Sequence, residues 1–297
     1  MPTRSPERRK VTINKLRGMK AKGEVITALG VYESVTASIA DSIGYNIFMT
    51  GPSGPMSLFG RTNPTQILFD EQLTTLKAVS RVTQYALVNA HMPYLTYQAS
   101  ARDAVVNAGR LVSEGGADTV KCDGTRALAP NIKAIVDAGI PVIAHIGLQA
   151  SRRIEQSGYG IKGATAKEAK RIIDDADALV DAGVFAVLIE HVCADVTALL
   201  TERLPVPTIS LGSGSHADGV CVISGDILNY SVFPRPIHAG QAVDIRSMIE
   251  TGLTDYASKV RDGSYPDDAT APHINNDEYL AFLTMAAREL PGGRNHA

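Results

Sequence analysis

Long hydrophobic runs are absent from this chain of 297 residues. No segment approaches the ~18 apolar residues of a membrane-spanning helix, and the opening MPTRSPERRK lacks the apolar stretch of a signal peptide. Cysteine is scarce: Cys122, Cys193 and Cys221 show no CxxC spacing, which fits a reducing compartment without a disulfide framework. The formal net charge of -2 gives no general attraction to nucleic acid. We therefore expect a cytoplasmic protein that binds neither membranes nor nucleic acid.

No linker rich in proline, serine or glycine interrupts the chain, so the sequence offers no natural boundary between two domains. Its 297 residues suit one barrel with a terminal extension. We expect a flexible arm over residues 1–10, a catalytic domain over 11–266 and a C-terminal extension over 267–297. The basic residues of the arm are interpreted as solvated surface rather than as an anion site.

The chain does contain eight short apolar runs, nearly all of which end in a polar residue or a glycine. They span residues 24–30, 46–51, 85–91, 118–123, 141–147, 185–191, 207–214 and 221–226. Most are separated by enough chain for a helix, and the motifs DSIGYN, SEGGAD, VDAGIP and VDAGVF each join a helix end, a glycine and the next run. Continuous apolar runs are typical of parallel strands that are buried on both faces. The pattern predicts an α/β fold, a (β/α)8 TIM barrel with a parallel eight-stranded core.

Two of the predicted helices are marked by their ends. Residues 34–44 carry apolar side chains at helical spacing and stop at a glycine. Residues 165–183 begin with Thr165 and Glu168 as a capping box and also stop at a glycine.

In a TIM barrel the active site forms where the strands end. The polar residues at these ends are Ser53, His91, Lys121, Asp123, His145, Glu190 and Asp226. We expect them to converge on one mouth. The segment 51–66 is predicted to be a binding loop or lid, and the glycines of 210–219 suggest a backbone nest for an anion. Both segments also suit ordinary structural loops.

Lys121 and Asp123 stand two residues apart on one predicted strand, so their side chains leave the same face, opposite Cys122. Such a pair suits an anionic substrate together with a metal ion or its water, and it also suits a structural ion pair. Glu190, at the end of FAVLIE, is a candidate for proton transfer. A single histidine at a strand end is more often a packing residue than a catalyst. The residues alone leave these alternatives open.

Several longer motifs carry a resemblance to a known family. They are VTINKLRGMKAKGE, the ADSIG helix, HMPYLTYQAS, NAGRLVSEGGADTVKCDG, AGIPVIAHIGLQ, GYGIKG, DADALVDAGVFAVLIEHV and LGSGSHADGVCVISGDIL. Over residues 11–266 the chain resembles the 3-methyl-2-oxobutanoate hydroxymethyltransferase family, which belongs to the phosphoenolpyruvate mutase/isocitrate lyase superfamily. The resemblance implies a TIM barrel and an assembly of many subunits, expected to be a decamer. It also implies transfer of a one-carbon unit from 5,10-methylenetetrahydrofolate to the enolate of a branched 2-oxo acid, with a divalent metal.

The resemblance assigns roles to individual residues. Glu190 matches the general base of the family, and Lys121 and His145 match further catalytic positions. Tyr32 and Ser53 match substrate-binding positions, a role that Lys121 shares.

The metal ligands depart from the family pattern. The family has Gly-Asp-Ser where this chain has Gly51-Pro52-Ser53, and Ala-Asp-Met-Pro where it has Ala90-His91-Met92-Pro93. Asp123 replaces a glutamate that is associated with the water shell of the metal. Arg61, in place of a tyrosine of the long loop, adds a cation to the substrate-binding residues.

These departures leave two arrangements. Mg²⁺ prefers oxygen ligands, which neither proline nor histidine supplies. In the first arrangement, His91 and Asp123 hold a softer divalent ion together with the substrate. In the second, no metal is bound, and Lys121, Arg61 and a protonated His91 meet the charge of the enolate.

The predicted function is therefore hydroxymethyltransferase or aldolase chemistry on a small 2-oxo acid, resembling ketopantoate formation. One alternative is a C–C lyase or hydrolase of the wider superfamily that acts on a 2-oxo acid or dicarboxylate. The other is a non-catalytic paralogue, which the retention of Tyr32, Lys121, His145 and Glu190 argues against. The residues specify neither the 2-oxo acid nor whether ketopantoate formation survives the loss of two aspartates.

Overall fold

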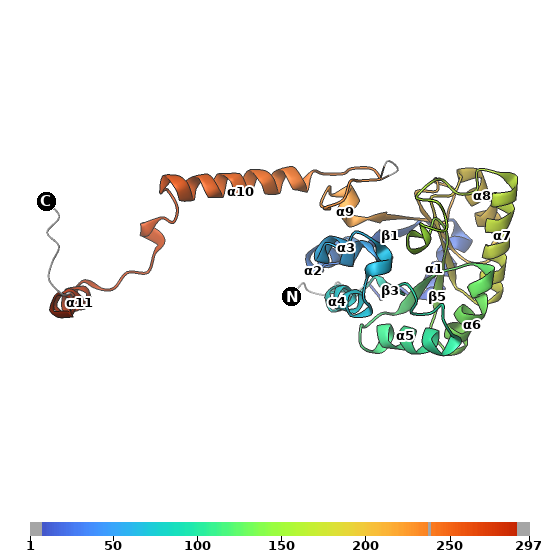
Figure 1. The fold of residues 1–297 in the computed structure, drawn as a ribbon, viewed down its shortest axis with the longest axis horizontal. Helices are drawn as coiled ribbons and strands as arrows, with labels where there is room; N and C mark the ends of the chain where they lie inside the picture. Colours follow the sequence, from blue (N-terminus) through green and yellow to red (C-terminus); the bar gives the residue numbers. More distant parts are fainter. Residues whose placement is uncertain (1–7, 237–238, 290–297) are drawn as a thin grey trace. The chain divides into compact units, whose positions relative to one another are not determined.

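Eight parallel strands form a closed barrel, in which each strand pairs with the next and the last returns to the first (Figure 1). This computed structural model describes residues 8–236 and 239–289. The strands are β1 (Ile26–Gly30), β2 (Ile47–Thr50), β3 (Leu87–His91), β4 (Thr119–Asp123), β5 (Val142–Gly147), β6 (Ala186–Glu190), β7 (Thr208–Leu211) and β8 (Gly219–Ile223). The predicted (β/α)8 TIM barrel is confirmed.

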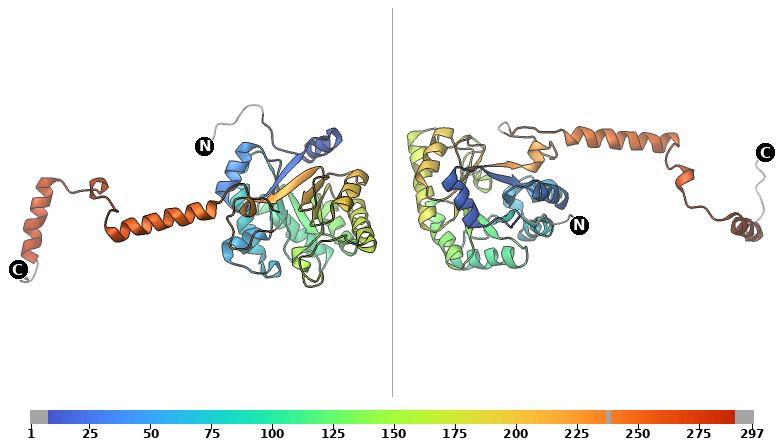
Figure 2. Two further views of the ribbon diagram at one scale, coloured as in Figure 1. Left: turned by 90° about the horizontal axis from the view of Figure 1, so that it is seen from above. Right: turned by 180° about the vertical axis from the view of Figure 1, so that it is seen from behind.

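Helices cover the outside of the barrel, as the views in Figure 2 show from two further sides. They are α2 (Ser34–Ile43), α4 (Phe69–Ser80), α5 (Ala101–Ser113), α6 (Ala129–Asp137), α7 (Ala166–Asp181) and α8 (Ala194–Arg203). The largest buried cluster lies between these helices and the outward faces of the strands. A further helix, α1 (Ile13–Lys22), places Leu16 and Met19 in the inner cluster with Ile26 and Ile143, so it seals the end of the barrel at which the strands begin.

The pleat of the strands separates apolar side chains from chemically active ones. In β4, Val120 and Cys122 pack outward against the helices, whereas Lys121 and Asp123 line the interior. In β5, His145 lies on the interior face in the same way. Because successive side chains of a strand alternate between its faces, one apolar run supplies both the outer core and the polar mouth.

Each predicted run contains a strand, but the last strand differs from its prediction. β8 begins at Gly219, where a Cβ would lie 2.5 Å from the carbonyl oxygen of Ile26, so the missing side chain permits this close pairing with β1. Residues beyond Ile223 form the short helix α9 (Ser224–Ile227). Asp226 therefore lies on a helix rather than at a strand end.

The predicted helices at 34–44 and 165–183 are both confirmed, with Gly44 ending α2 in a backbone of positive φ (122°). The orientation of α2 was not evident from its spacing, however. Its large apolar side chains are exposed, at 67% for Val35, 56% for Ile39 and 71% for Ile43, because alanines provide the buried contacts of this helix. The barrel unit therefore presents an apolar stripe along α2.

The chain divides into two compact units, one ending at Asp244 and the other beginning at Ile245. The second unit contains α10 (Ile245–Asp262), which buries no side chain, and α11 (Asn276–Glu289). The predicted end of the catalytic domain, residue 266, lies within this second unit, after α10. Residues 1–7 of the predicted arm lie outside the described ranges, and within that arm Lys10 forms an ion pair with Asp118 at 2.8 Å. In the described parts of the chain, no helix is both long and apolar enough to span a membrane.

Candidate active site

A cavity of about 260 Å³ opens at the carboxyl ends of the strands. The predicted site residues that line it are Tyr32, Ser53, His91, Lys121, Asp123, His145 and Glu190. Apolar side chains of the barrel interior, including Met49, Leu188 and Cys221, line it as well. The structure thus brings together residues from strands and loops that are far apart in the sequence.

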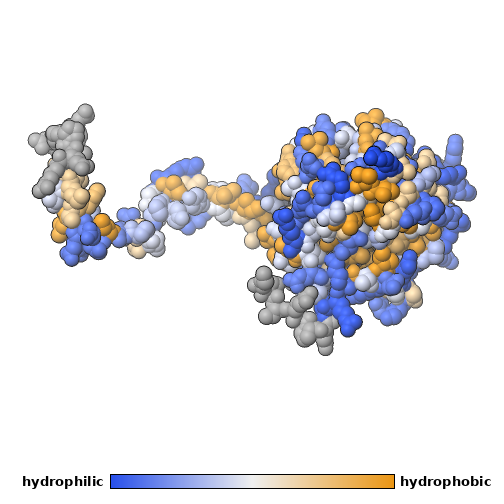
Figure 3. Space-filling model, turned by 90° about the horizontal axis from the view of Figure 1, so that it is seen from below, coloured by the Kyte–Doolittle hydropathy of each residue, from blue (hydrophilic) through white to orange (hydrophobic). Residues whose placement is uncertain are grey.

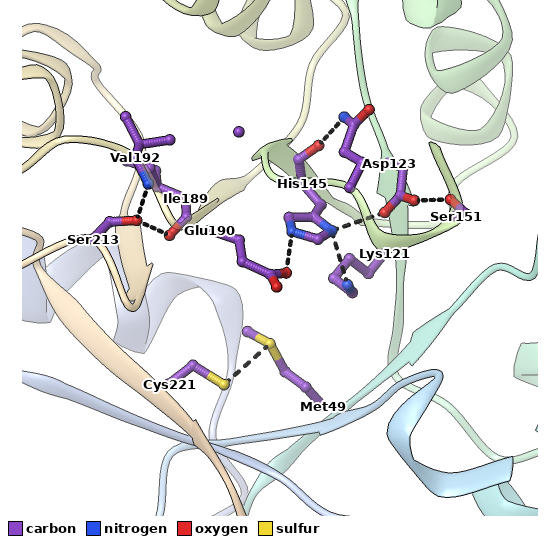
Figure 4. A network of polar contacts seen from close by, with 12 residues as sticks. Met49, Lys121, Asp123, His145, Ser151, Ile189, Glu190, Val192, Ser213 and Cys221 are labelled. Carbon is purple, nitrogen blue, oxygen red and sulfur yellow. Dashed lines mark hydrogen bonds and ion pairs between the residues drawn. The ribbon is translucent and has the colours of Figure 1, made fainter. Parts of the chain in front are cut away.

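His145 lies between two carboxylates (Figure 4). Its Nδ1 is 2.8 Å from Oδ1 of Asp123, and its Nε2 is 2.8 Å from Oε2 of Glu190. The second contact is at ion-pair distance but lacks the alignment of a linear hydrogen bond. β4, β5 and β6 are neighbours in the barrel, so the fold itself places these three side chains in a row.

The two carboxylates favour a protonated imidazole. Burial and the nearby Lys121 lower the pKa of His145, but the contacts with Asp123 and Glu190 outweigh them and leave this pKa raised. Burial alone would raise the pKa of Asp123, yet its hydrogen bond with His145 and the surrounding positive charges hold that pKa well below its usual range. We therefore assign a charged ring between two anions, with both nitrogens as donors.

Lys121 approaches the same histidine from β4, and its Nζ lies 3.2 Å from Nδ1 of His145. Because the Nδ1 proton of the charged ring points to Asp123, the ammonium group cannot donate to that nitrogen. Within the described ranges, no ion pair joins Lys121 to Asp123, and no other acceptor is bonded to the ammonium. The structural ion pair considered in the sequence analysis is therefore not formed, and Lys121 can receive an anion.

Ser151 is a site residue that sequence reasoning missed. Its hydroxyl donates to Oδ2 of Asp123, so both oxygens of this buried carboxylate have partners. Gln149 supports the same region by donating to the carbonyl oxygens of Gly124 and His145 at 2.8 and 2.9 Å. The length of the segment between β5 and α7, which exceeds a minimal βα turn, was the available signal.

His91 ends β3 and is almost fully buried, at 4% exposure. Its Nδ1 has no hydrogen-bond partner in the described structure. Burial, followed by the charge of Lys121, lowers the pKa of His91 to about 3. The ring is therefore neutral, which argues against the protonated His91 of the second arrangement.

Tyr32 and Ser53 reach the cavity from the loops that follow β1 and β2. The hydroxyl of Tyr32 donates to the carbonyl oxygen of Tyr230 at 3.2 Å, and burial raises the pKa of this tyrosine. Ser53 opens the short helix α3 (Ser53–Phe59), so part of the segment 51–66 is helical. Pro64 of the same segment also lines the cavity.

Arg61 is not among the residues that line the cavity. Its guanidinium binds the carboxylate of Glu71 through Nη2 at 2.6 Å and Nε at 3.0 Å. This paired contact ties the segment 51–66 to α4.

The segment 210–219 has a structural role at the end of β6. The hydroxyl of Ser213 donates to the carbonyl oxygen of Ile189 at 2.8 Å and accepts from the backbone nitrogen of Val192 at 2.9 Å. These bonds hold the backbone on both sides of Glu190, as Figure 4 shows.

Asp226 contributes a second partly buried carboxyl group to the cavity. Burial raises the pKa of Asp226 to about 6; Arg235 opposes this shift and the nearby Glu190 adds to it. The sequence predicts Asp226 at the mouth, and it does line the cavity, although α9 rather than a strand end carries it.

The donor set does not fit the Mg²⁺ that the family resemblance implies. In the described ranges, no group of three or more His, Cys, Asp or Glu residues is placed to hold a metal ion. Of the two predicted ligands, Asp123 already has both oxygens bonded, to His145 and Ser151, and His91 offers nitrogen rather than oxygen. An octahedral oxygen site would need ligands that these side chains do not supply.

Comparison with solved structures identifies the same barrel. A phosphonopyruvate hydrolase structure matches with a TM-score of 0.59 at 16% identity, covering 94% of this chain and 98% of the other. A 2,3-dimethylmalate lyase, described as a member of the PEP mutase/isocitrate lyase superfamily, matches with a TM-score of 0.55 at 15% identity, covering 96% and 98%. At these identities the likeness establishes the fold alone.

Sequence comparison is more specific. The enzyme named 3-methyl-2-oxobutanoate hydroxymethyltransferase from Moorella thermoacetica is 40% identical over 261 residues, which cover 88% of this chain and 97% of the relative. Its namesake from Hyperthermus butylicus is 37% identical over 286 residues, covering 96% and 99%. The family model for ketopantoate hydroxymethyltransferase matches residues 10–268. This chain belongs to the ketopantoate hydroxymethyltransferase family.

Proposed function

We propose that this protein forms ketopantoate by adding a one-carbon unit to the enolate of 3-methyl-2-oxobutanoate, with 5,10-methylenetetrahydrofolate as the donor. The observation that carries the proposal is the row Asp123–His145–Glu190 beside Lys121, in a single cavity of a chain that belongs to this family. The apolar side chains of Met49 and Leu188 suit the branched carbon chain of the substrate.

Glu190 is the general base in this proposal. Its carboxylate removes the proton from C3, next to the ketone, and the electrons of the broken C–H bond pass into the enolate. The charged ring of His145 orients Glu190, and Asp123 fixes that ring from the other side. The loose alignment between His145 and Glu190 allows the carboxylate to turn toward the substrate.

Lys121 meets the negative charge. An ammonium group that has no other acceptor among the described residues, in a buried site, stabilises a developing enolate oxygen more strongly than it would in water. Ser53 and Tyr32 are assigned to the carboxylate and ketone end of the substrate. Arg61, which is paired with Glu71, is assigned to holding the loop that carries Ser53.

Family membership implies a divalent metal, but the residues present provide for the enolate charge without one. Lys121 and the charged His145 are the two cations of the cavity wall in this scheme. The remaining metal arrangement, a softer ion at His91 and Asp123, would use the lone pairs of Asp123 left free by His145 and Ser151, but in the described residues it finds no third ligand among His, Cys, Asp and Glu. We therefore propose a site that works without Mg²⁺.

Carbon–carbon bond formation completes the reaction. Water replaces both donor nitrogens at the methylene carbon, so two C–N bonds break and formaldehyde and tetrahydrofolate form. The enolate carbon C3 then attacks the formaldehyde carbon, whose oxygen becomes the hydroxyl of ketopantoate. The proton taken by Glu190 passes to that oxygen.

The other functions considered are not favoured. Relatives that are 40% and 36% identical bear the hydroxymethyltransferase name, whereas the lyase and hydrolase resemble this chain in fold only. A non-catalytic paralogue would have no need of the charged His145 between two carboxylates.

We further propose a cytoplasmic homo-oligomer, with a decamer expected from the family. Its catalytic domain is taken as residues 11–266, with the arm and extension outside it. Both units carry apolar surface among hydrophilic side chains (Figure 3). The exposed apolar residues of the chain include Val35 and Ile39 of α2 and Leu253 of α10. Such surfaces are typical of subunit contacts. Light scattering should give a multiple of the 31.5 kDa chain mass, and a clean monomer would contradict the assembly.

The function is tested with purified protein and a panel of 2-oxo acids, each with and without the folate donor, with products identified by NMR. Ketopantoate should form only when 3-methyl-2-oxobutanoate and the donor are both present. Cleavage of a 2-oxo acid without the donor would contradict the proposal and favour a lyase.

A further inference from the structure

A second cavity, of about 550 Å³, lies beside the catalytic one. It is bounded by the loops after β4 and β5, by the segment that leads to α7, and by the first turns of α7 itself. It shares no lining residue with the catalytic cavity, but Gly147, the last residue of β5, and Gln149 just after it form part of its wall. None of the roles proposed above uses it.

Cationic side chains from separate segments meet at this cavity: Arg126, Arg152, Lys162 and Arg171. Two of them have acidic partners. Arg152 binds Glu155 at 2.6 Å, and Arg126 lies 3.2 Å from Asp174. In the described ranges, no carboxylate lies within ion-pair distance of the other two.

The acidic residues of the wall are engaged elsewhere. Glu168 accepts from the backbone nitrogen of Ala164 at 3.2 Å, and Asp175 accepts from the backbone nitrogen of Arg126 at 2.8 Å. They fix the beginning of α7 and the loop after β4. In the described ranges neither carboxylate forms an ion pair with Lys162 or Arg171, and the wall carries four cationic and three acidic side chains.

Lys162 is the notable cation because it is buried, at 7% exposure. Among the described residues its ammonium has one hydrogen-bond acceptor, the carbonyl oxygen of Gln156 at the long distance of 3.3 Å. An ammonium group removed from water is costly unless an anion and further acceptors surround it. The wall therefore holds a buried positive charge with unused donors, next to a space large enough for a ligand.

The backbone of Lys162 is fixed to the catalytic strand. Its nitrogen donates to the carbonyl oxygen of His191 at 2.9 Å, and its carbonyl oxygen accepts from the nitrogen of Cys193 at 3.0 Å. These residues follow Glu190 directly. An anion on Lys162 would thus be held at a constant distance from the catalytic base.

We propose that the second cavity is an anion-binding site for a carboxylate or phosphate group, with Lys162 as its main charged contact and Arg171 at its margin. The ligand has two possible sources. One is the glutamate tail of the folate donor, an assignment that rests on the proposed function. The other is a separate anion such as inorganic phosphate, which does not depend on it.

Binding is measured by calorimetry with two probes, inorganic phosphate and p-aminobenzoylglutamate, on the full-length protein. Wild type should bind at least one probe, and Lys162→Gln should weaken that binding about tenfold or more, because the charged contact is lost. Arg171→Gln, an exposed position that is less able to disturb folding, should weaken it by a smaller factor. Lys133→Gln removes a surface lysine that pairs with Asp137 on α6 and should bind as wild type does.

Binding of neither probe to wild type would overturn the site, and so would equal binding by wild type and Lys162→Gln. If Lys162→Gln does not fold, undiminished binding by Arg171→Gln overturns it instead. The source is decided by kinetics: a raised KM for the folate donor in Lys162→Gln, with kcat nearly unchanged, indicates the tail. Preferential binding of phosphate with an unchanged KM indicates a separate anion. Calorimetry measures binding without turnover, so its results hold even if the proposed activity is not found.

Discussion

The two halves of the catalytic mouth are built differently. On the β4–β6 side, Asp123, His145 and Glu190 contact one another, so their charges are set before a substrate arrives. On the β2–β3 side, the side chains stand apart: His91 is neutral with an unpartnered Nδ1, and Arg61 is turned to Glu71. This difference supports our assignment of proton transfer to the first half, and in the described residues the second half shows no cluster of His, Cys, Asp and Glu side chains placed to hold a metal ion.

The largest effect on activity should follow from a substitution in the row of Asp123, His145 and Glu190. In Asp123→Asn the ring of His145 loses its negative partner, so its pKa falls and Glu190 is no longer held beside a charged donor. We expect kcat to fall by about 10²-fold or more, with a smaller change in KM. Steady-state kinetics measure this, and Asp137→Asn on the surface of α6 is the control. A rate within about twofold of wild type would show that the row is structural.

The next prediction concerns metal binding on the β2–β3 side of the mouth. Wild type should keep its activity in excess chelator and should bind Mg²⁺ weakly, because oxygen ligands are missing at Pro52 and His91. The double variant Pro52→Asp/His91→Asp should gain Mg²⁺ affinity in calorimetry, whereas Pro52→Asn/His91→Asn, which adds no charge, should gain much less. Tight Mg²⁺ binding by wild type would contradict the comparison, and loss of its activity in chelator would show that a metal is needed.

A smaller effect is expected from pH. Asp226, whose pKa is raised to about 6, is neutral below that pH and anionic above it, and it shares the cavity with an anionic substrate. The KM for the 2-oxo acid should therefore rise as the pH increases through about 6, by roughly threefold to tenfold if one charge repulsion is added. Asp226→Asn should remove this rise. If KM depended on pH in Asp226→Asn as it does in wild type, Asp226 would not act on the bound substrate.

The smallest effect should come from Ser151. Ser151→Ala removes one hydrogen bond to Asp123 and leaves the contact with His145 in place, so kcat should fall only by about threefold to tenfold. The acidic limb of the pH–rate profile should also shift to higher pH, because the pKa of Asp123 rises when a donor is lost. Ser157→Ala in the same segment is the control. An unchanged rate and pH profile would remove Ser151 from the site.

Much of the barrel could be predicted from the sequence, because parallel strands and helix ends leave local signals. The alternation of Val120, Lys121, Cys122 and Asp123 was enough to place the polar pair on the inner face. β8 was harder: its start depends on Gly219 approaching β1, a contact between residues that are far apart in the chain.

The sequence was enough to predict which strand-end residues belong to the candidate site, but not the contacts between them. Position at a strand end selects His145 and Glu190, yet it does not say that the ring bridges two carboxylates. Ser151 and Gln149 could not be selected, because their roles arise from how a long loop folds back. Arg61 shows the reverse case, since a cation in a binding loop has its partner in Glu71 on the neighbouring helix.

The central claim is that Glu190 removes the C3 proton, and hydrogen exchange tests it most directly. 3-Methyl-2-oxobutanoate is incubated in D₂O with the protein, without the one-carbon donor, and loss of the C3 proton signal is followed by NMR. Wild type and the surface variant Glu114→Gln should exchange this hydrogen, and Glu190→Gln should do so about 10²-fold more slowly or not at all. Exchange at the wild-type rate in Glu190→Gln, or no exchange above background in wild type, would contradict the account.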